Sequence, residues 1–254
     1  MKTDLTIDPA RVHKLSASEV FVTDVETEDE LPPSVTVAVP GSHHRVQGHN
    51  RLPLVVLIEA LRQAGMAYNT LTRDPTPHVY ILDRIAVTLM GNRPLLDHTG
   101  WRQRVMLHTE YLPGGHSRTH MTIPNVCTST FDYRRTDPRV YARIRGSQHA
   151  VQMTSRHDPL LIHSHGTDGQ PTLELGWDTH DTMIFDHPVD HVPAMVLIDA
   201  ALAEYAESAG SPPHSIDAVF LGFLTMSDPV SITSEAGLVL FSQNDQVGAR
   251  VNVR

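Results

Sequence analysis

The sequence predicts an α+β chain built from two similar units, each with one long helix wrapped by a curved antiparallel sheet. The first observation is a repeat: residues 53–60 and 193–200 both start with Pro and share Val, Leu, Ile and Ala in matching columns. The second observation is that the same offset continues beyond the helix, in residues 79–81 and 219–221. A constant offset across helix, loop and strand indicates duplication of a whole unit.

The third observation is the character of the first expected helix. Residues 54–68 are apolar over most of a helical circumference, so this helix must be enclosed, which a bent sheet can do. A helix wrapped in this way is the hotdog arrangement, and two copies in one chain give a tandem (double) hotdog. We expect the first unit at residues 1–150 and the second at 151–254, both of ordinary domain size.

Alternating patterns and chain breakers set the elements of the first unit. A His- and Gly-containing loop, residues 41–51, leads to a helix that starts at Pro53, where a missing amide hydrogen costs nothing. Residues 74–77, with two prolines, end that helix. The other elements expected from alternation are strands at 19–24, 34–39, 78–90, 104–111 and 117–123, a connection at 124–138 and a closing strand at 139–145.

The second unit is expected to repeat this order after a linker at residues 149–169. Its helix should run from Pro193 to Ala209, followed by a Gly/Pro breaker. The final strands also agree with the repeat, since residues 140–144 resemble residues 247–251. The expected strands are 173–177, 182–185, 218–226, 230–233, 238–242 and 247–253.

Charge is unevenly distributed along the 254 residues, whose net charge is −9. No Lys or Arg occurs between His157 and Ala249, where fourteen acidic residues fall. The acidic total argues against general nucleic-acid binding, and anionic ligands should engage the first unit or the junction. The densest basic segment, Arg134–Arg145, reads either as a solvated strand edge or as a docking patch.

Other sequence features restrict location and chemistry. No apolar run is long enough to span a bilayer, and the N-terminus lacks a secretion signal, so we expect a cytoplasmic protein without membrane contact. Cys127, the one cysteine, rules out an internal disulfide and is expected to be a small buried filler, not a nucleophile. No dinucleotide, nucleotide-phosphate or serine-hydrolase motif occurs, and we expect no cofactor. The histidines are scattered in loops without zinc-site spacing, so we expect no metal.

Glu59 is the leading candidate for chemistry, because it stands inside an apolar helix. Desolvation disfavours a charged carboxylate, so we expect a raised proton affinity suited to general acid–base catalysis. Arg62 and Gln63 follow on the same helical face and either hold the carboxylate or bind a phosphate or thioester carbonyl. The alternative is a structural Glu–Arg pair at the rim of a core.

The second unit offers three further candidates. Asp199 answers Glu59 in the repeat and is either catalytic or a structural polar contact. Asp190 and His191 precede the helix and either cap it, fix the loop, or act on substrate. His191 is the better catalytic candidate because imidazole exchanges protons near neutral pH, and Asp190 would then bind substrate.

Several separated motifs resemble the A-factor biosynthesis (AfsA-type) hotdog family, the γ-butyrolactone autoregulator synthases. They comprise residues 12–14 with Glu19 and Val20, residues 57–65, residues 185–193, and Arg145 with Gly146. The resemblance implies transfer of a β-ketoacyl group from a carrier-protein (ACP) or coenzyme A thioester to dihydroxyacetone phosphate, in an enzyme that could be a homodimer. Residues 202–204 and Ala194 depart from the usual pattern of the second helix.

Two other function classes stay open. A hotdog thioesterase or 3-hydroxyacyl dehydratase also places an acidic residue on the central helix. Dehydratases add a His in a longer Gly/Pro loop before that helix, which the sequence does not clearly reproduce. A non-catalytic module that binds acyl chains or acyl carrier protein would use the Arg134–Arg145 segment for docking.

Overall fold

The computed structural model describes residues 7–26, 33–72, 79–145, 160–165, 171–187 and 189–254. The chain divides into two compact units: Met1–Ile81 with Val87–Ala142, and Leu82–Ala86 with Arg143–Arg254. The expected boundary at residue 150 lies outside the described residues. None of the described helices combines the length and apolar character that a bilayer crossing requires.

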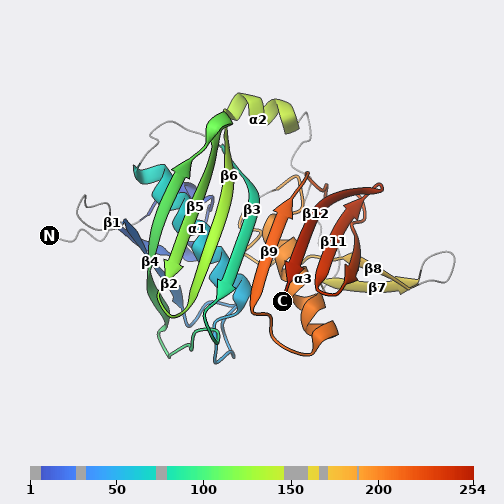
Figure 1. Cartoon of the computed structure of the whole chain (residues 1–254), viewed down its shortest axis with the longest axis horizontal. Coiled ribbons are helices and arrows are strands. Elements are labelled where there is room, and N and C mark those ends of the chain that lie inside the picture. Colours follow the sequence, from blue (N-terminus) through green and yellow to red (C-terminus); the bar gives the residue numbers. More distant parts are fainter. Residues whose placement is uncertain (1–6, 27–32, 73–78, 146–159, 166–170, 188) are drawn as a thin grey trace. The chain divides into compact units, whose positions relative to one another are not determined.

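Unit 1 contains an antiparallel sheet with the strand order β1-β2-β4-β5-β6-β3, although the middle of β3, Leu82–Ala86, is grouped with unit 2 (Figure 1). One face of this sheet is buried, as the alternation of buried and at least partly exposed side chains along β5 illustrates. Three short 3-10 helices, Pro9–Val12, Ala17–Glu19 and Pro113–Gly115, accompany it. The strands are β1 (Val22–Glu26), β2 (Ser34–Pro40), β3 (Val79–Leu89), β4 (Gly100–Tyr111), β5 (His116–Ile123) and β6 (Cys127–Thr136).

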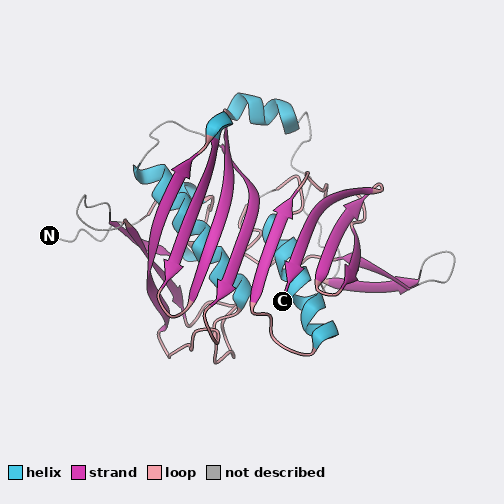
Figure 2. Ribbon diagram, in the orientation of Figure 1, coloured by secondary structure: helices cyan, strands magenta, loops and turns pink. Residues whose placement is uncertain are grey.

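Helix α1 (Leu54–Thr72) packs against β1, β2, β4, β5 and β6, and Figure 2 shows it lying against these strands. Every side chain from Leu54 to Asn69 is buried except Arg62, which is partly exposed. Burial of each large apolar side chain contributes about 1.5–3 kcal/mol. The expectation that this helix is enclosed by a sheet is therefore confirmed.

Unit 2 has strands in the order β9-β12-β11-β10-β8-β7 and one helix, α3 (Ala194–Ala209). The buried residues Met195–Leu202 of α3 lie on a helix that packs against β12 and β7. Gly210 ends α3 with a positive φ of 64°, which glycine adopts without strain. The strands are β7 (Leu161–His165), β8 (Pro171–Leu175), β9 (Ser215–Phe220), β10 (Ser231–Glu235), β11 (Leu238–Gln243) and β12 (Gln246–Val253).

Two expectations at the end of unit 1 are wrong. Residues 124–138, expected as a connection, contain β6, which pairs with β5 along its length. Residues 139–145, expected as a closing strand, form helix α2 (Pro138–Arg145). The Asp137 carboxylate accepts the Arg139 amide at 2.7 Å, and Pro138 is suited to a first helical turn. Residues 140–144 are thus not the structural counterpart of residues 247–251, which lie in β12.

Two expectations in unit 2 are also wrong. Residues 182–185 form a turn instead of a strand, since the Asp181 carbonyl accepts the Ile184 and Phe185 amides. The expected linker at 149–169 contains β7, although its residues 149–159 and 166–169 lie outside the described part.

Burial predicts which leucines stabilise unit 1. Leu61 is fully buried on α1, whereas Leu95 is 67% exposed. We expect Leu61→Ala to lower the free energy of unfolding by roughly 2–5 kcal/mol, because it leaves a cavity in a packed core. The matched control Leu95→Ala should change it by less than about 0.5 kcal/mol. Urea denaturation measures both, and equal effects would contradict the assigned core.

Candidate functional site

Glu59 lies at the centre of a buried ionic cluster on α1. Arg62 donates from Nε to Oε2 at 2.7 Å and from Nη2 to Oε1 at 2.8 Å. Gln63 Nε2 donates to Oε1 at 2.9 Å, and Lys14 Nζ lies 3.2 Å from the same oxygen. The three helical residues meet because positions three and four apart share one helix face. Glu59 itself has no exposed surface.

The charges around Glu59 reverse the expected effect of burial. Burial raises the pKa of Glu59, but the Arg62 and Lys14 charges and the hydrogen bonds from Arg62 and Gln63 outweigh it and lower the pKa to about 2. The expectation of a raised proton affinity is wrong. At neutral pH Glu59 is an ionised, weakly basic carboxylate. Arg62 and Gln63 both hold this carboxylate, which is one of the two roles expected of them.

Gln63 uses its whole amide inside the protein. Besides Glu59, Nε2 donates to the Glu19 carbonyl at 2.8 Å, and Oε1 accepts the Phe21 amide at 2.7 Å. Both amide hydrogens and the oxygen therefore have protein partners, which argues against contact between this amide and substrate. Gln63 ties α1 to the segment that carries Glu19.

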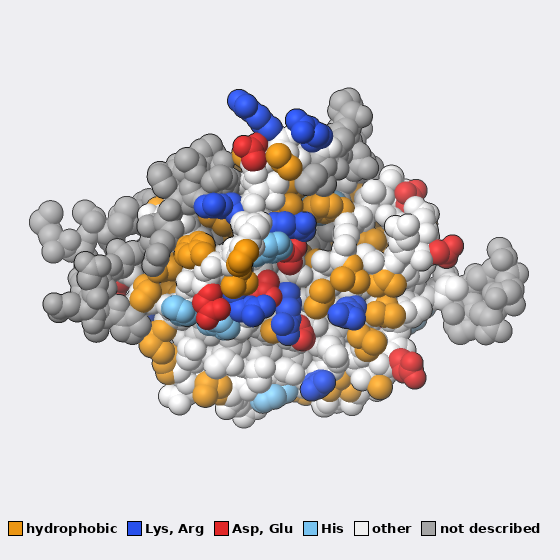
Figure 3. Space-filling view, turned by 45° about the horizontal axis from the view of Figure 1, so that its top comes forward, with side chains coloured by type: hydrophobic (Ala, Val, Ile, Leu, Met, Phe, Trp, Pro, Cys, Tyr) orange, Lys and Arg blue, Asp and Glu red, His pale blue; other side chains and the backbone are white. Residues whose placement is uncertain are grey.

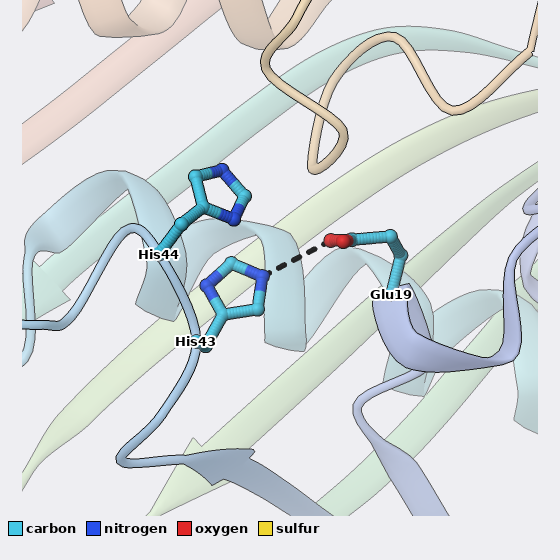
Figure 4. A group of neighbouring side chains, drawn as sticks. All are labelled: Glu19, His43 and His44. Carbon is cyan, nitrogen blue, oxygen red and sulfur yellow. Dashed lines mark hydrogen bonds and ion pairs between the residues drawn. The ribbon is translucent and has the colours of Figure 1, made fainter.

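A second group, which sequence reasoning did not single out, comprises Glu19, His43 and His44 (Figure 4). Glu19 ends the second short 3-10 helix, and both histidines lie in the loop between β2 and α1. His43 Nε2 lies 3.0 Å from Glu19 Oε2, and both side chains are buried, whereas His44 is exposed. The adjacent histidines ahead of the helix were the available signal, but nothing local indicated that Glu19 would face them.

Hydrogen bonding fixes the protonation of His43. The Arg45 amide donates to Nδ1 at 3.2 Å, so Nδ1 carries a lone pair and Nε2 carries the proton that it donates to Glu19. Among the described residues, Glu19, His43 and His44 are the group whose ligand atoms lie close enough to surround a cation, within 4.8 Å of one another. A neutral His43 held in this way offers no free lone pair, so these residues fit a metal ion poorly.

The candidates of unit 2 lie on α3 and in the loop before it. Asp199 is buried on α3. His191 Nδ1 lies 3.0 Å from Asp190 Oδ1, and its ring meets the edge of Phe223 at a centroid distance of 5.3 Å. Helix α3 begins after Pro193 without a side-chain cap, so the capping alternative for Asp190 and His191 is wrong. The bridge between His191 and Thr225 fixes this loop.

The structure also tests the expectations for Cys127 and for the basic segment Arg134–Arg145. Cys127 is buried at the start of β6, and burial raises its pKa to about 12, so the thiol stays protonated as expected of a filler. Arg139 and Arg143 are exposed on α2, and basic side chains gather over this helix at the top of Figure 3. Arg134 and Arg135 lie at the end of β6, which lies between β5 and β3, and residues 138–145 form α2, so the basic segment is not the expected strand edge.

Comparison with known proteins places the first of these clusters in a family. The model of the A-factor biosynthesis hotdog domain (AfsA) matches residues 1–108. The matched residues make up less than half of the 254-residue chain. They contain the whole Glu59 cluster and the Glu19–His43–His44 group, and the match confirms the resemblance for this part of the chain. Among curated proteins, none matches this sequence.

Solved structures show the fold of this chain. It is similar to an acyl-ACP thioesterase from Bacteroides thetaiotaomicron, with a TM-score of 0.55, 13% identity and coverage of 87% of this chain and 96% of that one. It is also similar to HtdX of Mycobacterium tuberculosis, with a TM-score of 0.51, 13% identity and coverage of 87% and 99%. These likenesses support an α+β hotdog fold.

The Glu59 cluster predicts a pH-dependent stability. Glu59→Gln keeps the side-chain size but removes the charge that Arg62 and Lys14 face, and we expect a loss of roughly 3–5 kcal/mol at neutral pH. Because folding lowers the pKa of Glu59 from 4.5 to about 2, its contribution is complete above about pH 4.5 and is lost as the pH falls toward 2. Urea denaturation across this range should show a shallower acid decline in the variant.

The matched control is Glu235→Gln, which changes an exposed carboxylate at the end of β10. It should leave both the stability and its acid decline within about 0.5 kcal/mol of the wild type. Equal stability of Glu59→Gln and the wild type at neutral and at acid pH would show that the buried ions cancel without net effect.

Proposed function

We propose that this protein is an acyltransferase. It would move a β-ketoacyl group from an ACP or coenzyme A thioester to the hydroxyl of dihydroxyacetone phosphate or a similar C3 acceptor, leading to a γ-butyrolactone or butenolide-type signalling molecule. The observation that carries this proposal is the AfsA match over residues 1–108, which contain the enclosed helix α1 and the neighbouring side chains Glu19, His43 and His44. We further propose that both units are hotdogs, making the chain a tandem double hotdog.

The charges of unit 1 are compatible with this reaction. Glu59 faces the cations Arg62 and Lys14, and Glu19 faces a neutral His43. The two negative and two positive charges of these groups balance, so no substrate charge is needed to neutralise them. A phosphorylated acceptor must find its counter-charge elsewhere. Arg45 directly follows His44 in the loop and is partly exposed, which suits an anionic group brought next to the histidine.

The buried contacts change the role that we propose for Glu59. A carboxylate with a pKa of about 2 takes up a proton from a hydroxyl poorly, so Glu59 is proposed as a positioning residue that orders Arg62 and Lys14. Asp199 and His191 remain the catalytic candidates of unit 2, with Asp190 as the partner of His191. Arg62 is the one member of the α1 cluster that keeps some exposure, and it remains a candidate for substrate contact.

A second candidate function is 3-hydroxyacyl dehydration or thioester hydrolysis. The specific observation in its favour is the loop before α1, where exposed His44 is followed by Gly48 and Pro53. Gly48 has a φ of 79°, so the loop uses it for a left-handed turn. A histidine in a Gly/Pro loop before the helix is a dehydratase feature, and the position of His44 ahead of α1 favours this alternative to that extent.

Product analysis separates these functions. The purified protein is incubated with a β-ketoacyl thioester, with and without dihydroxyacetone phosphate, and the products are followed by mass spectrometry. We expect a phosphorylated ester or butenolide, with one free thiol released per product, only when the acceptor is present. Release of free acid at the same rate without acceptor would indicate a thioesterase instead. Conversion of a 3-hydroxyacyl thioester to an enoyl product would indicate a dehydratase, and binding without turnover a non-catalytic module.

A further inference from the structure

We propose that His44 is the catalytic base of the acyl transfer and that Glu19 and His43 are its positioning residues. This inference rests on the proposed function and assigns a role to residues that the sequence analysis left aside. The three side chains come from two separate segments, and Figure 4 shows Glu19 directed toward the two rings.

Accessibility selects His44 within the group. Glu19 is 4% and His43 is 8% exposed, so neither can be reached freely by a hydroxyl arriving from solvent, whereas His44 is exposed. Imidazole is the side chain that gains and loses protons most readily near neutral pH. His44 is therefore the member of the group that can meet a substrate and exchange a proton with it.

The contacts of His43 exclude it as the base. Its Nδ1 accepts the Arg45 amide and its Nε2 proton is donated to Glu19, so both ring nitrogens are used inside the protein. This arrangement holds one Glu19 oxygen in place at 3.0 Å. His43 thus acts on the carboxylate and, through it, on the neighbouring histidine.

Glu19 and the His43 ring together position His44. A His44 nitrogen lies within 4.8 Å of both a Glu19 oxygen and a His43 nitrogen. The His43 and His44 rings are 4.4 Å apart between centroids and tilted by 33°, which limits rotation of the exposed ring. A fixed carboxylate beside imidazole stabilises the imidazolium that forms when His44 takes up a proton.

The proposed acyl transfer conserves atoms and protons with His44 and the two substrates alone. His44 takes the proton of the acceptor hydroxyl as its oxygen forms a bond to the thioester carbonyl carbon. The carbon–sulfur bond then breaks, and the imidazolium returns the proton to the departing sulfur. One ester and one thiol are formed, and His44 ends in its initial neutral state.

Chemical rescue tests the assignment. We expect His44→Ala to lower kcat roughly 10²–10⁴-fold with little change in the KM for the thioester, and added imidazole to restore part of the rate. The matched control is His49→Ala, an exposed histidine of the same loop, which should stay within about twofold of the wild type. An active His44→Ala, or an inactive one with wild-type folding and no response to imidazole, would overturn the proposal.

A second readout does not require turnover. Diethyl pyrocarbonate carbethoxylates neutral imidazole, and peptide mass spectrometry gives the rate at each histidine. His44 and His49 should react at clearly different rates in the wild type, and Glu19→Gln should change the rate at His44 alone. This result together with a missing ester product would reject the acyl transfer but keep the positioned histidine. Equal rates at both positions in both proteins, or a zinc ion retained stoichiometrically by the wild type and lost in His44→Ala, would overturn the group's assigned roles.

Discussion

The architecture of unit 1 depends on a single ionised carboxylate inside its central helix. Glu59 accepts hydrogen bonds from Arg62 and Gln63 and lies 3.2 Å from the Lys14 ammonium, all within an apolar surrounding. A buried charge without partners would cost several kcal/mol, so the helix can be enclosed only with these partners in place. Lys14 lies far upstream in the chain, and the N-terminal segment is thereby tied to α1.

The same requirement separates two tasks that one carboxylate could not perform together. A carboxylate strong enough to hold two cations in a core binds a proton poorly, and a carboxylate that exchanges protons must be less firmly held. Under the proposed mechanism, residues 1–108 divide these properties between two groups of side chains. Glu59 carries the buried charge, while the loop before α1 presents an exposed imidazole next to a second carboxylate, Glu19.

The sequence predicted the parts of the fold whose patterns are local. Helix α1 is apolar over most of its circumference, and enclosure by a sheet suits such a helix. β6 was missed because prolines at positions 124 and 138 suggested a connection, although Phe131 and Tyr133 alternate with polar residues. α2 was misassigned because its Val, Tyr and Ile also suit a strand. The Asp137 carboxylate favours the helix by accepting the Arg139 amide at its start.

The site was less predictable, since its electrostatics come from contacts distant in sequence. Within its helix Glu59 has mainly apolar neighbours, which gave the wrong direction for its pKa. Arg62 was visible, but neither the approach of Lys14 nor the pairing of Glu19 with His43 follows from spacing. The family resemblance pointed to the segments that carry Lys14, Glu19 and Glu59 without indicating these contacts.

Gln63 has a further implication for how this protein can vary. Its amide spans from the Glu59 carboxylate to the backbone at Glu19 and Phe21, and it needs two hydrogens, one oxygen and a two-carbon stem to do so. Asparagine is too short to span this gap, and glutamate would set a second anion against the first. Both the length and the polarity of the side chain therefore restrict substitution at this position. A homologue without glutamine here would need other hydrogen bonds to connect α1 to the backbone at Glu19 and Phe21.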